Sequence, residues 1–240
     1  MSTYVVVGLQ YGDEGKGKIT DVLSAKSDYV VRFQGGDNAG HTVYAGEEKF
    51  VLHLLPSGVL QCKRKCIIAN GVVVNPNAFL KEIVQIEEKE MRTDHVFISR
   101  RAHVIMPYHI LLDTYREEEA GGTHIGTTKK GIGPCYEDKI ARIGIRMVDL
   151  LNPEVLEEKI RKNLKIKNSL FEKYFEKPTL EFDEIYKEFL ELGEKLKDRI
   201  VDTEVELNQA IHDGKNILFE GAQAAMLDID FGTYPYVTSS

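Results

Sequence analysis

The chain has 240 residues, of which 42% are hydrophobic and 29% are charged, and it contains no tryptophan. This length is enough for one large domain or two small ones, and the composition is that of a globular protein. The net charge of -7 argues against nucleic acid or a membrane surface as a partner, since both favour a basic face. It does not exclude phosphate ligands, which backbone N–H groups and a few lysines can bind locally.

The sequence shows no targeting segment and no membrane span. No apolar run approaches the roughly 20 residues that cross a bilayer, and residues 1–7 have neither the basic region nor the cleavage site of a signal peptide. We therefore expect a cytoplasmic protein. Cys62, Cys66 and Cys135 are expected to be thiols, because their number is odd and nothing indicates secretion. Structural zinc is not expected, since no second Cys or His pair lies near Cys62 and Cys66 at a zinc spacing.

Short apolar runs alternate with loops rich in glycine and asparagine in the first half of the chain. Buried strands are predicted at Tyr4–Leu9, Tyr29–Phe33, Cys66–Ala69 and Val96–Ser99. An amphipathic helix is predicted at Asn77–Glu90, and Lys49–Leu55 is predicted to be a hairpin strand. This alternation is typical of an α/β fold.

The pattern becomes helical and highly charged after Asn152, a predicted helix N-cap that precedes Pro153. Helices are predicted at Glu154–Leu164, Glu184–Leu196 and Asp202–Ile211, and a strand at Asn216–Phe219. Strands and helices interleave along the chain, so we expect the α/β class, with a mainly parallel central sheet, flanking helices and a P-loop-like phosphate-binding loop. Residues 1–240 are expected to be part of a single large α/β domain that carries a helical insertion at about 152–213.

The last segment, Gly232–Ser240, is dense in polar groups of the kind that bind ligands. A natural terminus usually ends in less specific residues. We therefore expect that the chain is truncated and that a C-terminal remainder is absent.

A first glycine-rich loop, Gly12–Lys18, follows the predicted strand Tyr4–Leu9 and precedes a helix predicted to begin near Lys18. Such a unit can aim backbone N–H groups at phosphate oxygens, and its two lysines add positive charge. It is not a regular Walker A sequence, because Gly17 stands where that motif has its Mg²⁺-binding Ser or Thr. Asp13 could supply an oxygen ligand instead. The alternative is a plain strand-to-helix turn with solvated charges, but the strand and the lysines favour phosphate binding.

A second glycine-rich segment, Gln34–Thr42, follows the predicted strand Tyr29–Phe33. It should reach the edge of the sheet where α/β folds place their ligands. His41 is the candidate general acid, since the ordinary pKa of histidine lies near neutrality. Taken alone, a histidine in such a loop is more often merely exposed or hydrogen-bonded. A third loop, Gly121–Pro134, is basic and rich in hydroxyl groups, and could be a mobile surface loop or an anion-binding lid.

Four segments together resemble, in the same order, the active-site segments of adenylosuccinate synthetases. They are Gly12–Lys18, Gly35–Thr42, Ile125–Arg142 and Phe219–Ser240, and the resemblance covers essentially the whole chain. It implies a carbon–nitrogen ligase of AMP biosynthesis that joins IMP and L-aspartate to adenylosuccinate with GTP, through 6-phosphoryl-IMP. It also implies Mg²⁺ as the cofactor and a homodimer, and no nucleic-acid or membrane partner.

The resemblance implies a role for each matching residue. The implied catalytic residues are Asp13, Lys16, His41 and Gln223. Asp13 would take the N1 proton of IMP, and His41 would act at the β-phosphate of GTP. The implied GTP-binding residues are Gly12, Asp13, Glu14, Gly15, Lys16, Gly17, Lys18, Gly40, His41 and Thr42. The implied IMP-binding residues are Asp13, Glu14, Gly15, Lys16, Asn38, Ala39, Gly40, His41, Thr128, Arg142, Gln223 and Thr238. The implied Mg²⁺ ligands are Asp13 and the carbonyl of Gly40, and Arg142 would reach the neighbouring active site of the dimer.

Some expected features are missing or altered. The guanine-recognition segment and the arginine-rich loop for aspartate have no counterpart here, so we expect the chain alone to bind IMP weakly and to be inactive. Ala224-Ala225-Met226 stands where a glycine is expected, which would leave the backbone less free to adopt a positive φ. Two rival functions stay open: a nucleotide switch or simple GTPase that uses the first loop alone, and a non-catalytic fragment that only dimerises.

Overall fold

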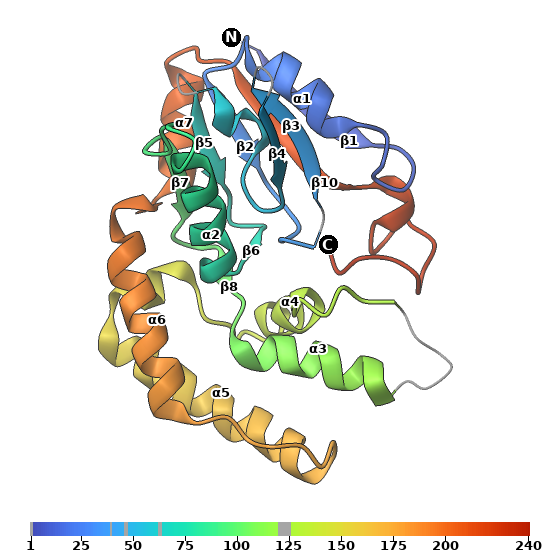
Figure 1. Ribbon diagram of the computed structural model, residues 1–240, viewed down its shortest axis with the longest axis vertical. Helices are drawn as coiled ribbons and strands as arrows, with labels where there is room; N and C mark the ends of the chain where they lie inside the picture. The colour runs from blue at the N-terminus through green and yellow to red at the C-terminus, as the bar shows by residue number, and fades with distance from the viewer. Residues whose placement is uncertain (1, 39, 46–47, 62–63, 120–125) are drawn as a thin grey trace.

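The computed structural model describes residues 2–38, 40–45, 48–61, 64–119 and 126–240. Within these residues, a six-stranded sheet has the order β1-β10-β2-β5-β7-β9, and each neighbouring pair is parallel (Figure 1). Its strands are β1 (Thr3–Gly8), β2 (Tyr29–Arg32), β5 (Lys65–Ile68), β7 (Val96–Ser99), β9 (Ile200–Val201) and β10 (Ile217–Ala224). The predicted α/β class with a mainly parallel central sheet is confirmed.

Both faces of the sheet are covered, as the alternation along β2 shows. Val31 belongs to a cluster with Ile67, Ile217 and Ala210, the last from helix α7 (Thr203–His212). Val30 points to the other face, where α2 (Pro76–Glu87) and the antiparallel hairpin of β3 (His41–Ala45) and β4 (Glu48–Leu52) complete the main core. The helix predicted from Asn77 and the hairpin strand predicted from Lys49 are therefore present.

The other elements surround this sheet. They are α1 (Lys16–Ser24), α3 (Pro107–Glu119), α4 (Ile132–Ile140), α5 (Pro153–Lys173), α6 (Phe182–Leu196), the short parallel pair β6 (Val73–Val74) and β8 (His103–Val104), and the 3-10 helices η1 (Ser57–Leu60), η2 (Met147–Leu151), η3 (Lys197–Arg199) and η4 (Ala225–Leu227). Across the described ranges, no helix is long and apolar enough to cross a membrane.

Helices α5 and α6 form an arm that extends away from the sheet (Figure 1). The predicted N-cap is confirmed: the side chain of Asn152 accepts a hydrogen bond from the N–H of Val155 at 3.3 Å, and Pro153 is the first helical residue. The chain then returns to the sheet before residue 213, because β9 pairs with β7 and α7 packs on the sheet face. Only the first part of the stretch 152–213 therefore lies away from the sheet.

The prediction of a buried first strand is wrong for β1. Val5 is 59% exposed, and Tyr4, Val7 and Leu9 are also exposed. Strand β1 is the outer strand of the described sheet and pairs with β10 alone, so no neighbour covers its far side. Sequence alone shows that a strand is apolar, but it does not show where in the sheet the strand lies.

Two further differences concern the loops. Helix α3 was not predicted, and α4 begins at Ile132, inside the expected loop Gly121–Pro134. Gly131 has a left-handed backbone and precedes α4, so the glycine that indicated a loop is in fact the start of a helix. His41 and Thr42, expected in a loop, are the first residues of β3. Residues 121–125 and Cys62 lie outside the described residues.

Candidate active site

A cavity of about 580 Å³ opens where β1, β10 and β2 end. Its walls come from segments far apart in the sequence: the loop after β1, the segment after β2, the end of β10, and two threonines from the loops before α4 and after η4. Of the site residues expected from sequence, the following line this cavity: Gly12, Asp13, Gly15, Lys16, Gly17, Lys18, Asn38, Gly40, His41, Thr42, Thr128, Gln223 and Thr238. The fold thus brings most of the expected residues to one place.

Three expected residues are not on this wall. Glu14 is exposed but is not among the residues that line the cavity, and Arg142 is exposed beyond the end of α4. Ala39 lies outside the described residues. Arg142 has a left-handed backbone, with φ of 64°, and its guanidinium makes no ion pair within the described chain. Arg142 therefore does not line the cavity of its own chain.

The first loop leads directly into α1. Gly15 occupies the N-cap position with φ of 85°, and its carbonyl accepts the N–H of Lys18 at 3.1 Å. A residue other than glycine would be strained in this conformation. No side chain caps this end of α1. The first N–H groups of the helix are therefore available to an anion, which the positive end of the helix dipole also favours.

Lys16 is held by its own loop. Its ammonium donates to the carbonyl of Gly12 at 3.2 Å and lies 3.4 Å from a carboxylate oxygen of Glu14. The backbone N–H groups of Glu14 itself, Gln10 and Gly12 lower the pKa of Glu14 to about 2. A phosphate that enters the cavity would compete with these oxygens for the ammonium of Lys16.

His41 joins the two glycine-rich segments. A Cβ atom on Gly17 would lie 3.0 Å from that of His41, so the contact depends on the missing side chain. Burial lowers the pKa of His41 to about 4, with nearby Glu220 opposing and Arg32 assisting the shift. The imidazole is therefore neutral at pH 7 without a ligand, although its ordinary pKa had suggested a group that titrates near neutrality.

Sequence reasoning missed two buried charged residues beside this cavity. Arg32 is 2% exposed and donates to the carbonyls of Gly36, at 2.6 Å, and of His53. Glu220 is 4% exposed and lies 3.9 Å from His41. Arg32 ends β2, and Glu220 directly follows the apolar residues 217–219 of β10; a charged residue after an apolar run is the signal that could have identified each.

Helix α4 is tied to the second glycine-rich segment by one phenol. The hydroxyl of Tyr136 donates to the carbonyl of Gly71 at 2.6 Å and accepts the N–H of Gly35 at 3.0 Å. A smaller cavity of about 240 Å³ adjoins the main one and shares Asn38, Thr128 and Thr238 with it. The hydroxyl-rich segment before α4 and the last residues of the chain therefore face a common space.

The backbone restriction expected at residues 224–226 has no consequence in the structure. Ala224 has an extended backbone, with φ of -133° and ψ of 163°, which any residue adopts. A glycine is not needed at this position, because no positive φ is required.

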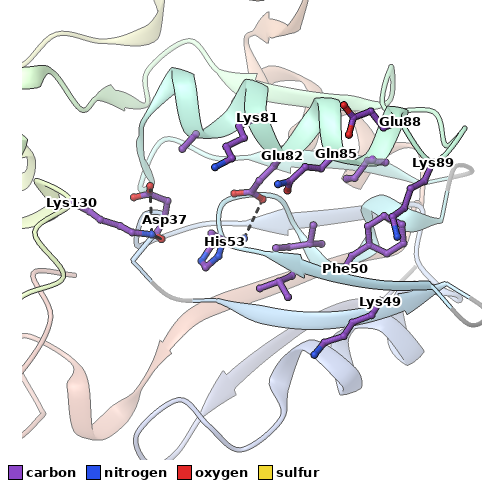
Figure 2. A pocket seen from close by; sticks show the side chains of 14 residues that line it. Asp37, Lys49, Phe50, His53, Lys81, Glu82, Gln85, Glu88, Lys89 and Lys130 are labelled. Atoms are coloured by element: carbon purple, nitrogen blue, oxygen red, sulfur yellow. Dashed lines mark hydrogen bonds and ion pairs between the residues drawn. The ribbon is translucent and has the colours of Figure 1, made fainter.

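A larger pocket, of about 650 Å³, lies between α2 and the β3–β4 hairpin (Figure 2). None of the expected site residues lines it. Its inner charges are already engaged: Glu82 accepts the N–H groups of residues 53–55 at 2.9–3.2 Å, and Lys130 donates to the carbonyl of Asp37 at 2.6 Å. The ring of His53 would lie 2.9 Å from a Cβ on Gly40, so His53 packs closely against the second glycine-rich segment.

The cavity is lined by oxygen atoms that could coordinate Mg²⁺. Asp13 and Gly40 both line it, the first with a carboxylate and the second with a backbone carbonyl. Mg²⁺ in nucleotide sites is typically held by one or two protein oxygens, several waters and the substrate phosphates. Among the described residues, no group of three or more His, Cys, Asp or Glu side chains could hold a metal alone. The residues present therefore fit a metal that binds together with a phosphate ligand.

Known proteins share the sequence and the fold of this chain. The chain is 62% identical over its full length to an adenylosuccinate synthetase of Fusobacterium nucleatum and 56% identical to one of Thermodesulfovibrio yellowstonii. It spans only 56% of the length of each of these relatives. A solved structure of fully ligated adenylosuccinate synthetase from Plasmodium falciparum matches 99% of the chain with 41% identity and a TM-score of 0.89, over 55% of that protein.

A more distant structure shares the fold alone. It is a cyanophage S-2L succinoaminodeoxyadenylate synthetase, 24% identical, with a TM-score of 0.62. The family model described as adenylosuccinate synthetase matches residues 5–240. With this match and the 62% identity, the chain belongs to the adenylosuccinate synthetase family.

Proposed function

We propose that the whole protein that carries this chain is a ligase of AMP biosynthesis that joins IMP and L-aspartate to adenylosuccinate and converts GTP to GDP and phosphate. One observation carries this proposal: both glycine-rich segments, the end of β10 and the two threonines converge on one cavity. A simple GTPase would need the first loop, but not a wall that includes Asn38, Thr128, Gln223 and Thr238.

The proposed reaction starts with the carbonyl oxygen of IMP, which is a poor leaving group. Asp13, exposed in the cavity, takes the N1 proton, so that this oxygen becomes a nucleophile toward the γ-phosphorus of GTP. The product, 6-phosphoryl-IMP, then loses phosphate when the amine of aspartate attacks. Gln223, at the end of β10, would help to hold IMP during both steps.

Charge moves toward the GTP phosphates in the first step, and three features of the chain are placed to stabilise it. They are the uncapped start of α1, the ammonium of Lys16 and the imidazole of His41. An anion beside His41 would raise its pKa from about 4, since opposite charge favours the protonated form. Mg²⁺, held by Asp13 and the carbonyl of Gly40, would neutralise part of the phosphate charge when bound.

Arg142 is proposed to act across a homodimer interface, on the IMP of the partner. Its exposure beyond α4 and its lack of an ion pair in the described chain support this assignment. The guanine-binding and aspartate-binding residues are proposed to lie in the 44% of the relatives' length that this chain does not match, since the match covers 56% of them. The chain alone is then proposed to be inactive, and the cytoplasmic location stays a prediction from sequence.

The first test is phosphate release by the whole protein, with IMP, GTP and aspartate omitted one at a time. The proposal requires all three substrates for release. Release with GTP alone would favour a GTPase, and turnover by the 240-residue chain alone would contradict its proposed dependence on the longer protein.

A second test separates the ligase from a fragment that only dimerises. Arg142→Ala is expected to lower IMP affinity at least tenfold, the loss of one charge-assisted contact, while dimerisation measured by ultracentrifugation is retained. Unchanged IMP affinity would contradict the assignment of Arg142. The matched control is Arg161→Ala, an exposed arginine of α5 that pairs with Glu157 and should leave IMP affinity unchanged.

A further inference from the structure

Glu220 is an ionisable residue in the middle of β10, buried beside the cavity. It is 4% exposed and stands opposite Arg32 in the parallel pairing of β10 with β2. Its carboxylate accepts two hydrogen bonds from Ser57 at the start of η1, one from the N–H at 2.9 Å and one from the hydroxyl at 2.5 Å. Burying a carboxylate is costly unless it is well paired. These donors hold the carboxylate in one place.

The imidazole of His41 faces this carboxylate. Its Nε2 lies 3.9 Å from Oε1 of Glu220, and this nitrogen is buried without a hydrogen-bond partner. The gap is about 1 Å longer than an N–H···O hydrogen bond, so a small rotation of the ring would close it. A buried nitrogen without a partner needs an explanation, and the nearby carboxylate provides one.

The chemistry of the two groups decides which nitrogen carries the proton. An ionised carboxylate can only accept hydrogen bonds. A neutral imidazole has one N–H and one lone pair, and a lone pair on Nε2 would be repelled by the Oε1 atom of Glu220. The N–H of His41 is therefore favoured on Nε2, and the lone pair on Nδ1.

We propose that Glu220 is a positioning residue for His41: it fixes the imidazole with Nε2–H toward its own Oε1, so that Nδ1 faces a bound phosphate and donates to it once Nδ1 carries a proton. Nothing in the resemblance to relatives assigned Glu220 a role. The proposal resembles, in physical terms, the orientation of a histidine by a carboxylate in other catalytic sites. It rests on the proposed function only for the identity of the phosphate ligand.

A purely structural role for Glu220 is the alternative. In that case the carboxylate would serve only to hold Ser57 and η1. Glu220→Gln distinguishes the two roles, because the amide oxygen can still accept a hydrogen bond from Ser57 while the negative charge beside His41 is lost. A structural role predicts no change at His41, whereas a positioning role predicts a change in its tautomer.

The test is NMR of the ring nitrogens of ¹⁵N-labelled histidine in the whole protein that carries this chain, at neutral pH, with His41→Asn used to assign the signal. In the unsubstituted chain, His41 is expected as the Nε2–H tautomer. Glu220→Gln is expected to raise the Nδ1–H fraction about fivefold, as for the loss of one unit charge about 4 Å away. Glu206→Gln, which changes a glutamate on α7 paired with Lys65, is the matched control and should leave His41 unchanged.

Two results would overturn the inference: an Nδ1–H tautomer in the unsubstituted chain, or an unchanged tautomer in Glu220→Gln. The first needs no variant, so it holds even if Glu220→Gln does not fold. Adding GTP separates this inference from the proposed function. An Nε2–H tautomer that responds to Glu220→Gln, with no response of His41 to GTP, would leave the positioning role intact and count against the ligase.

Discussion

Two buried polar clusters of this molecule differ in their hydrogen bonding. The charged groups of one are paired with each other, so this cluster is complete, whereas atoms of the other have no partner among the described residues, so that cluster is incomplete. The complete cluster joins three helices. Asp138 of α4 accepts hydrogen bonds from Lys167 of α5 at 2.6 Å and from His109 of α3 at 3.0 Å. The N–H of Met106 donates to the other nitrogen of His109 at 2.9 Å. Burial raises the pKa of Asp138, but the hydrogen bonds from His109 and Lys167 outweigh it, so that its pKa falls below the usual value.

The incomplete cluster lies at the cavity. The side-chain oxygen of Asn38 and Nε2 of His41, both of which line the cavity, are buried without a hydrogen-bond partner. Buried polar atoms in native proteins are nearly always paired. The charged groups of the helical cluster pair with one another, whereas these two cavity atoms have no partner in the described chain.

The largest expected effect concerns the complete cluster. Asp138→Ala leaves the buried ammonium of Lys167 and the N–H of His109 without an acceptor. We expect the free energy of unfolding to fall by about 3–5 kcal/mol, as for a broken buried ion pair, measured by urea denaturation. The control is Glu137→Ala on the same helix, whose exposed pair with Arg116 should contribute at most about 1 kcal/mol. Equal losses in both variants would contradict the comparison.

The pH dependence of stability should be the next largest effect. Burial lowers the pKa of His41 and of His103 from 6.5 to about 4. Each histidine is protonated more readily in the unfolded chain, so the stabilisation present above pH 6.5 is lost as the pH falls toward 4. These two histidines alone allow a slope of about 2.7 kcal/mol per pH unit in this window, and His95 and His109, whose pKa values burial also lowers, add to it.

Urea denaturation at a series of pH values measures this slope. A saturating phosphate ligand distinguishes the two histidines. It should raise the pKa of His41 in the cavity and leave the pKa of His103, which lies in β8, unchanged. Equal pKa changes of both histidines on adding the ligand would contradict the placement of His41, and not His103, beside the ligand.

A smaller effect is expected on stability, but a clear one on binding, when Asn38 is changed. Asn38→Ala removes an oxygen that has no partner without a ligand. The free energy of unfolding should change by less than about 0.5 kcal/mol, whereas IMP affinity, measured by calorimetry, should fall about tenfold through one lost hydrogen bond. A loss of stability without a loss of affinity would place Asn38 among the structural residues.

The smallest effect is expected at the outer strand. Val5→Lys on β1 should change the free energy of unfolding of the 240-residue chain by less than about 0.5 kcal/mol, because Val5 is 59% exposed. The matched control is Val30→Lys on β2, where the side chain is 0% exposed and a buried, unpaired charge should prevent folding. A large loss for Val5→Lys in urea denaturation would show that another chain or segment covers β1.

The sequence predicted much of the fold because its signals are local. Runs such as Tyr29–Arg32 and Lys65–Ile68 are too apolar and β-branched for an exposed loop, and they form β2 and β5. Asn152 and Pro153 marked the start of α5 through capping chemistry that depends only on neighbouring residues. Helix α3 was missed because its apolar side is narrow and many of its other residues are charged or polar.

The candidate site likewise contains residues that local sequence signals predict and residues that they do not. Glycines and lysines in Gly12–Lys18 and the segment around His41 can be recognised in sequence, because phosphate binding needs a particular backbone and charge. Arg32 and Glu220 carry no such local pattern. Their importance follows from their burial and from the partners that the fold brings to them, which are distant in sequence.

By itself, then, the sequence determined most strands of the central sheet, where the glycine-rich loops lie and which family the chain resembles, since these depend on residue types and spacing. Only the tertiary structure decided the strand order, the exposure of β1, the convergence of the loops on one cavity, and which buried polar atoms have partners. The physical reason is distance along the chain: Ser57 and Glu220, or Gly17 and His41, meet only after the parallel strands have been assembled side by side.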